Sequence, residues 1–203
     1  MIPVPERMTH LERDRRGYPI PWNVLRDADD GTPFFVVNDD RRQKQAFRES
    51  RCPICGGLLG RWRWFVGGPL SAFDPNGWYV DLPGHHECIQ FALQTCPYLA
   101  MPSYGHRIDG ILVAHREKLK KLNPPILLDE TVIPDRPEIF VAVAGSKIEV
   151  APRGPLQPYV RPTRPLLGIE FWQHSRRIDA AAARPALRRA LGEAFTLPVG
   201  VGL

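Results

Sequence analysis

Long apolar runs and the best-known catalytic motifs are both missing from this sequence. No stretch approaches the roughly 18 consecutive apolar residues of a transmembrane helix. The first residues show no apolar segment behind a basic start, so we expect a cytoplasmic protein with no secretory signal and no membrane contact. No Gly-x-Ser-x-Gly elbow, His-Glu-x-x-His helix or Walker loop is present, which excludes the commonest signatures of hydrolases, metalloproteases and nucleotide-binding proteins.

The composition is that of an ordinary globular protein with an uneven charge distribution. The 203 residues are 43% hydrophobic and 24% charged, and the net charge is +5. The positive surplus lies in residues 150–203, which hold eight arginines against three acidic residues. A basic segment of this kind is compatible with nucleic-acid binding but does not require it.

The few cysteines are the most informative residues. Cys52 and Cys55 form a Cys-x-x-Cys-Gly-Gly sequence, which is typical of a zinc knuckle, because the glycines allow the backbone to turn tightly behind two thiolates. A disulfide is disfavoured without an export signal, and no βαβ pattern surrounds the pair to favour a redox role.

The second ligand pair is expected at the start of a helix near Gly84. His85 and Cys88 lie about 60° apart on such a helix, so both can reach one ion, whereas His86 points about 160° away from Cys88. Cys96 lies roughly 12 Å beyond Cys88 along a helix and is interpreted as a small buried apolar residue. The alternative, with Cys96 as fourth ligand in place of His85, requires a broken helix.

A knuckle, a β-hairpin and a ligand-bearing helix follow one another in the order of a treble clef. The expected strands of the hairpin are 59–66 and 78–82, separated by an Asp-Pro-Asn-Gly turn. The fold class is therefore α+β, with one structural zinc ion on Cys52, Cys55, His85 and Cys88. Four protein ligands leave no open coordination position, which favours a structural metal over a catalytic one.

Several motifs together resemble a family of small proteins from phages and bacteria. They span residues 13–102 and comprise Gly17-Tyr18-Pro19-Ile20-Pro21-Trp22, Cys52-x-x-Cys55-Gly56, Leu59-Gly60, Phe65-Val66-Gly67-Gly68-Pro69-Leu70, His85-x-x-Cys88 and Cys96-Pro97-Tyr98-Leu99. The resemblance implies that the Cys/Cys/His/Cys set belongs to the pattern of the family. It implies no activity.

The chain is expected to have three parts. Residues 1–102 form an N-terminal arm and the zinc module, residues 103–135 form a connecting helix and proline-rich linker, and residues 136–203 form a β-rich region with a basic helix. The local patterns predict a buried strand over 34–37, helices over 40–49, 106–123 and from Asp179 to about 191, a hairpin over 139–150, an extended arm over 154–165 and a strand over 166–172. Pro185 should kink the last helix or move its start to Arg184.

The function favoured by these features is that of a binding or regulatory accessory protein that contacts nucleic acid. Phosphate contacts are expected from arginines at two places: Arg61 and Arg63 beside two tryptophans, and Arg176, Arg177, Arg188 and Arg189 near the C-terminus. Two alternatives remain open. One is an adaptor that binds a phage or host protein, and the other is an HNH-like, metal-dependent nuclease that uses His86 and Glu87.

Overall fold

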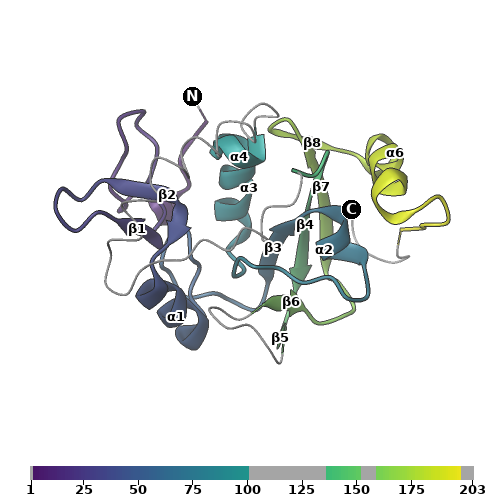
Figure 1. The fold of residues 1–203 in the computed structure, drawn as a ribbon, viewed down its shortest axis with the longest axis horizontal. Helices are drawn as coiled ribbons and strands as arrows, with labels where there is room; N and C mark the ends of the chain where they lie inside the picture. The colour runs from purple at the N-terminus through teal and green to yellow at the C-terminus, as the bar shows by residue number, and fades with distance from the viewer. Residues whose placement is uncertain (1, 101–135, 152–158, 198–203) are drawn as a thin grey trace.

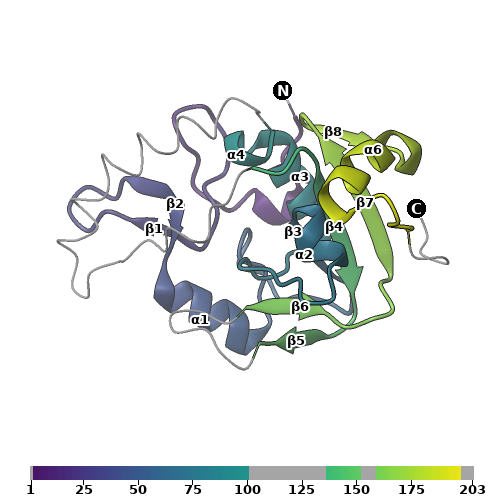
Figure 2. The ribbon, with the colours of Figure 1, turned by 45° about the vertical axis from the view of Figure 1, so that its right-hand side comes forward.

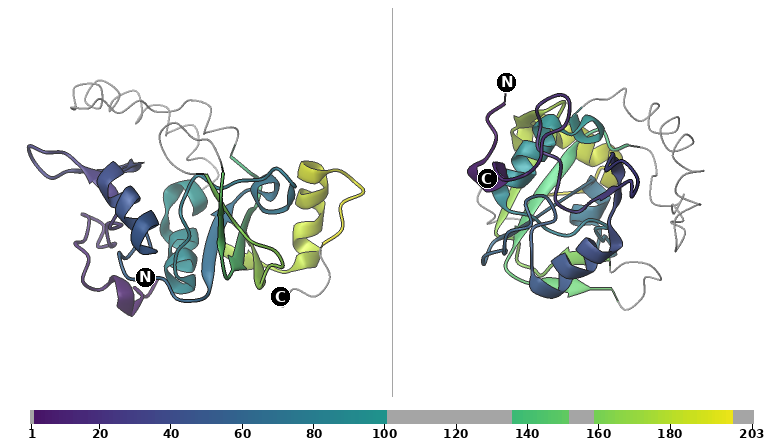
Figure 3. Two further views of the ribbon diagram at one scale, coloured as in Figure 1. Left: turned by 90° about the horizontal axis from the view of Figure 1, so that it is seen from below. Right: turned by 90° about the vertical axis from the view of Figure 1, so that its left-hand side faces the viewer.

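A computed structural model describes residues 2–100, 136–151 and 159–197, and it has an α+β architecture. A four-stranded antiparallel sheet lies between two layers of helices (Figures 1 and 3). Its strand order is β3 (Arg63–Gly67), β4 (Phe140–Gly145), β7 (Gly168–Gln173) and β8 (Arg176–Ile178). Within these described stretches, no helix has the length and apolar character needed to cross a membrane.

The central strand β4 is apolar on both faces, which explains the two helical layers. On one face, Ala142 and Ala144 contribute to a core shared with α3 (His86–Thr95), which is followed by α4 (Pro97–Ala100). On the other face, Val141 and Val143 join a core with α2 (Pro69–Phe73) and α6 (Ala180–Leu191). All four of these side chains are fully buried, as the two-sided covering of the strand requires.

The remaining elements lie around this sandwich. The 3₁₀ turn η1 (Glu6–Met8) and the hairpin of β1 (Val24–Arg26) and β2 (Pro33–Asn38) precede α1 (Asp40–Glu49). A second two-stranded sheet consists of β5 (Ile148–Val150) and β6 (Val160–Pro162) and lies near α1 in Figure 2. Ala46 of α1 and Val160 of β6 belong to one buried cluster.

The helices with capping signals form where the sequence predicts them. Asp39 accepts hydrogen bonds from the backbone N–H groups of Arg41 and Arg42 and so caps α1. Asp179 caps α6 through the N–H of Ala182, and Gly192 ends that helix. Of the two outcomes predicted for Pro185, the helix start at Arg184 is wrong, because α6 begins at Ala180 and contains this proline.

The hairpin expected between the two ligand pairs does not form. Residues 78–82 are not a strand, and β3 pairs along its length with β4 instead, while its other edge meets Gly84 through an isolated bridge. Strand β4, which is buried along its whole length, lies beside β3 in place of residues 78–82, and Tyr79 forms an isolated bridge with Val160 instead. After β3, Gly68 is the N-cap of α2 and Pro69 its first residue, because proline at the first position suits a helix start.

The hairpin expected over 139–150 is also wrong. Both edges of β4 are occupied, by β3 and β7, and β5 pairs with β6. At Gly145 a Cβ atom would lie 2.5 Å from Pro162, so the chain passes too closely there for any side chain. The sheet consequently joins β3 from the N-terminal part of the chain to three strands of the region 136–203.

The other predicted elements have mixed outcomes. The predicted strand over 166–172 corresponds to β7. Strand β2 is only half-buried, with Phe34 inside and Phe35 46% exposed, whereas the sequence predicted a buried strand. The predicted helix over 106–123, the connecting part over 103–135 and residues 154–158 of the predicted extended arm lie outside the described residues.

Candidate metal centre

Four side chains predicted as metal ligands come together in the fold. One ligand atom from each of Cys52, Cys55, His85 and Cys88 lies within 4.8 Å of every other, and all four residues are buried. In a tetrahedral zinc site with Zn–S bonds of about 2.3 Å, neighbouring sulfurs are roughly 3.8 Å apart. The donor set, the spacing and the burial therefore fit a single metal ion.

The first ligand pair is held by a tight knuckle. The N–H of Cys52 donates to the carbonyl of Gly57 at 2.8 Å, and the N–H of Gly56 donates to the carbonyl of Cys52 at 2.8 Å. Gly56 has a φ of +75°, and a Cβ atom there would lie 2.8 Å from the ring of Trp22. Glycine is thus required at this position by both backbone conformation and space.

Replacing Gly56 with alanine should therefore weaken both folding and metal binding. The left-handed backbone and the contact with Trp22 together should cost about 1–3 kcal/mol of unfolding free energy. Gly60→Ala is the matched control, since Gly60 has no positive φ and no atom within 4 Å of its added Cβ. Chemical denaturation of the metal-loaded protein measures the difference, and equal stability of the two variants would contradict this interpretation.

The second ligand pair is positioned by the start of α3. His85 occupies the N-cap position and Cys88 lies in the first turn. The Nε2 atom of His85 is 2.9 Å from the carbonyl oxygen of Leu58, and Nδ1 is 3.3 Å from Sγ of Cys55. Because a carbonyl only accepts, Nε2 carries a proton, so Nδ1, which faces the sulfurs, is the nitrogen that can bind a metal ion once the ion displaces the proton shared there.

The electrostatics of the cluster favour a cation. Hydrogen bonding to Cys52 and Cys55 raises the pKa of His85 to about 10, and hydrogen bonds from Cys52 and Cys88 lower the pKa of Cys55. Hydrogen bonds to Cys52 and Cys55 raise the pKa of Cys88. The closely spaced sulfurs thus resist carrying several negative charges without a metal, and a bound ion would displace the protons they share.

The N-terminal arm covers the site. Met8 and Phe91 form a buried cluster with the three cysteine ligands, and Tyr18 packs edge-on against Phe91 with ring centroids 6.1 Å apart. A cleft of about 400 Å³ beside the knuckle is lined by Arg7, His10, Trp22, Cys55, Gly56 and Gly57. Cys55 is nevertheless only 2% exposed, so the ligand cluster is closed to solvent.

Cys96 is not part of the cluster. It is half-buried at the C-cap of α3, where burial raises the pKa of its thiol. The alternative that makes Cys96 the fourth ligand in place of His85 is therefore wrong, because α3 is unbroken between Cys88 and Thr95.

His86 and Glu87, the pair required by the nuclease alternative, point to different partners. Glu87 forms an exposed ion pair with Arg7. His86 stacks on Trp64 with ring centroids 4.0 Å apart, and its Nε2 lies 2.8 Å from Oε1 of Glu170. The fold does not bring these two side chains together in one site.

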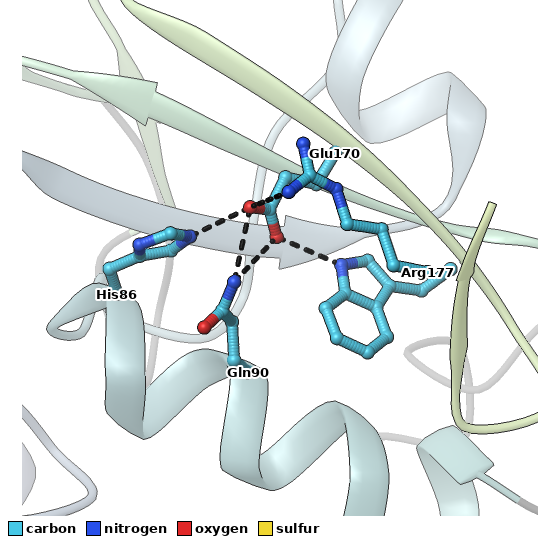
Figure 4. A network of polar contacts seen from close by, with 5 residues as sticks. His86, Gln90, Glu170 and Arg177 are labelled. Atoms are coloured by element: carbon cyan, nitrogen blue, oxygen red, sulfur yellow. Dashed lines mark hydrogen bonds and ion pairs between the residues drawn. The ribbon is translucent and has the colours of Figure 1, made fainter. Parts of the chain in front are cut away.

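Glu170 is the centre of a polar network that sequence reasoning missed (Figure 4). The residue is 4% exposed, on β7, and its carboxylate also accepts hydrogen bonds from Gln90 at 3.2 Å and from Trp172 at 3.0 Å, with Arg177 at 3.4 Å. Burial alone would raise its pKa, but hydrogen bonds from His86 and Trp172 outweigh burial and lower it. One signal in the sequence could have indicated this network. Glu170 is the single acidic residue of the predicted strand over 166–172, which is otherwise apolar, and a buried acid needs partners.

The arginines predicted to bind nucleic acid are not gathered on one surface. Arg63 begins β3 and Arg61 lies just before it, whereas Arg176 and Arg177 lie on β8, at the opposite edge and the opposite end of the sheet. Three of the C-terminal arginines face carboxylates: Arg177 with Glu170, Arg188 with Glu193 at 3.7 Å, and Arg189 with Glu138 at 2.6 Å.

The chain matches no protein-family model, no curated protein and no solved structure. Its own geometry is consequently the basis of the functional interpretation.

Proposed function

We propose that this chain is a zinc-stabilised accessory protein that binds single-stranded nucleic acid. Zinc is the metal best suited to three thiolates and one imidazole in a closed cluster. The role proposed for the ion is structural, because four buried protein ligands leave no position for water or substrate. We assign the knuckle and α3 to a treble-clef-like module. The strand after the knuckle, β3, pairs with β4, which is not part of this module.

The observation that carries the nucleic-acid proposal is the exposure of Trp62. This indole is 52% exposed, whereas Trp64, two residues later, is 7% exposed. Arg61, which precedes Trp62 in the chain, is exposed, and Arg63, which follows it, is half-buried with a buried Nε atom that has no hydrogen-bond partner among the described residues. An exposed indole with an arginine on either side of it in the sequence offers a stacking platform for a base and positive charge for the adjoining phosphates.

Trp62→Ala should weaken binding to a single-stranded oligonucleotide by about tenfold or more, since stacking one base on an aromatic side chain is worth about 1–3 kcal/mol. The matched control is Trp78→Ala, because Arg161 already covers that indole, with its guanidinium carbon 4.4 Å from the ring centroid. Fluorescence anisotropy with labelled DNA and RNA oligonucleotides measures both variants. The platform assignment fails if the two substitutions weaken binding equally or if neither does.

Two assays distinguish the proposed function from its two alternatives, the protein-binding adaptor and the nuclease. Absence of binding to any DNA or RNA at about 50 mM salt, where electrostatic attraction is strong, would favour the protein-binding adaptor. Cleavage of plasmid in the presence of Mg²⁺ or Mn²⁺ that disappears in His86→Ala would favour the nuclease.

A further inference from the structure

Helix α3 carries two sets of side chains with different partners. His85 and Cys88, at its N-cap and first turn, belong to the metal cluster. His86 and Gln90, four residues apart and therefore on one face of the helix, hold the carboxylate of Glu170. The two sets alternate along the helix, since His86 directly follows His85 and Cys88 lies between His86 and Gln90.

Glu170 is well suited to fix this helix in position. Its carboxylate is buried at the middle of the sheet and receives donors from α3, from its own strand and from Arg177 of β8 (Figure 4). With its lone pairs occupied by these donors, it is a fixed anchor, and a buried carboxylate that loses its donors is costly. Trp64 also holds His86, because its ring stacks on the imidazole ring.

We propose that Glu170 is a positioning residue of the metal centre, holding His86 and Gln90 so that the adjacent His85 and Cys88 meet the ion in the correct geometry. None of the partners of Glu170 among the described residues is a metal ligand, and the four ligands all come from residues 52–88. The inference requires a metal on the Cys₃His cluster, as proposed above, but it does not require nucleic-acid binding.

The first test measures how tightly the folded protein holds Zn²⁺ against a chromophoric chelator of known affinity. Residues that orient ligands typically contribute 10–100-fold to metal affinity. Glu170 acts through a neighbour of a ligand, so Glu170→Gln should lower the affinity by about tenfold. The matched control is Glu149→Gln, the same change on strand β5, where the glutamate pairs with Arg161 far from the network. The control should retain wild-type affinity.

A second pair of variants keeps the test informative if Glu170→Gln folds poorly. His86 has a side chain that is 41% exposed, so substitutions there should be tolerated. His86→Ala removes the donor to Glu170 and should reproduce the loss of affinity, whereas His86→Gln restores an N–H donor and should recover most of it.

The absorption spectrum of Co²⁺ bound in place of zinc distinguishes positioning from simple destabilisation. A change in ligand geometry alters the d–d bands of the bound ion, whereas a smaller folded fraction only reduces their amplitude. We expect altered bands in Glu170→Gln and His86→Ala. Wild-type spectra and wild-type affinity in both variants would overturn the proposal. A wild-type chain that takes up neither Zn²⁺ nor Co²⁺ would instead refute the metal centre itself.

Discussion

Cys88→Ser is expected to lose the metal and to unfold the layer around it, whereas Cys96→Ser keeps one metal per chain. Structural zinc contributes apparent binding energies of about 10–16 kcal/mol in zinc-finger peptides, which is comparable to the whole stability of a typical domain. Met8 and Phe91 pack directly on the cysteine ligands, so their packing depends on an intact cluster. Both substitutions exchange a thiol for a hydroxyl, and only the first removes a ligand.

Native mass spectrometry gives the metal content, and circular dichroism during titration with a chelator gives the loss of structure. Chelation of the wild type should resemble Cys88→Ser. A wild-type protein that is folded without metal, or a Cys88→Ser variant as stable as Cys96→Ser, would show that the cluster does not stabilise the fold through an ion.

Raising the salt concentration from about 50 to about 200 mM should weaken single-strand binding by roughly sevenfold. Arg61 and Arg63 flank the proposed stacking platform in the sequence, so we expect about two phosphates to be neutralised. Each phosphate neutralised on a single strand contributes about −0.7 to the slope of log affinity against log salt concentration. Arg61→Ala with Arg63→Ala should therefore remove most of the salt dependence.

Arg188→Ala with Arg189→Ala is the matched control, because it removes the same charge from α6. The sequence alone predicted phosphate contacts from this second pair. In the fold, Arg189 is paired with Glu138 through two nitrogens and Arg188 faces Glu193, so we expect the slope to change little. A larger effect from the α6 pair than from the β3 pair would move the interface to the C-terminal helix.

Elements with local signals were predicted well from the sequence. Helix α1, the ligand-bearing start of α3 and the predicted strand that corresponds to β7 are each encoded within about ten residues. The metal cluster was predicted for the same reason, since knuckle and helix-start ligands follow from short spacings.

Long-range pairings were missed because nothing in a local pattern identifies a distant partner. The local pattern over 139–150 predicted a hairpin, but β4 is buried along its whole length between β3 and β7, and the partly exposed β5 pairs with β6. Glu170 was overlooked for the same reason, because its importance depends on His86, which lies 84 positions earlier.

The pairing of β3 with β4 has a consequence for synthesis on the ribosome. Phe65 and Val143 are opposite each other in the sheet although 78 positions separate them. Contacts across such a distance form slowly, and domains fold as units during translation. The knuckle and α3 will therefore emerge well before β4, with the apolar side of β3 uncovered. Early capture of the metal by the nascent chain would hold this segment in place until its partner strand is made.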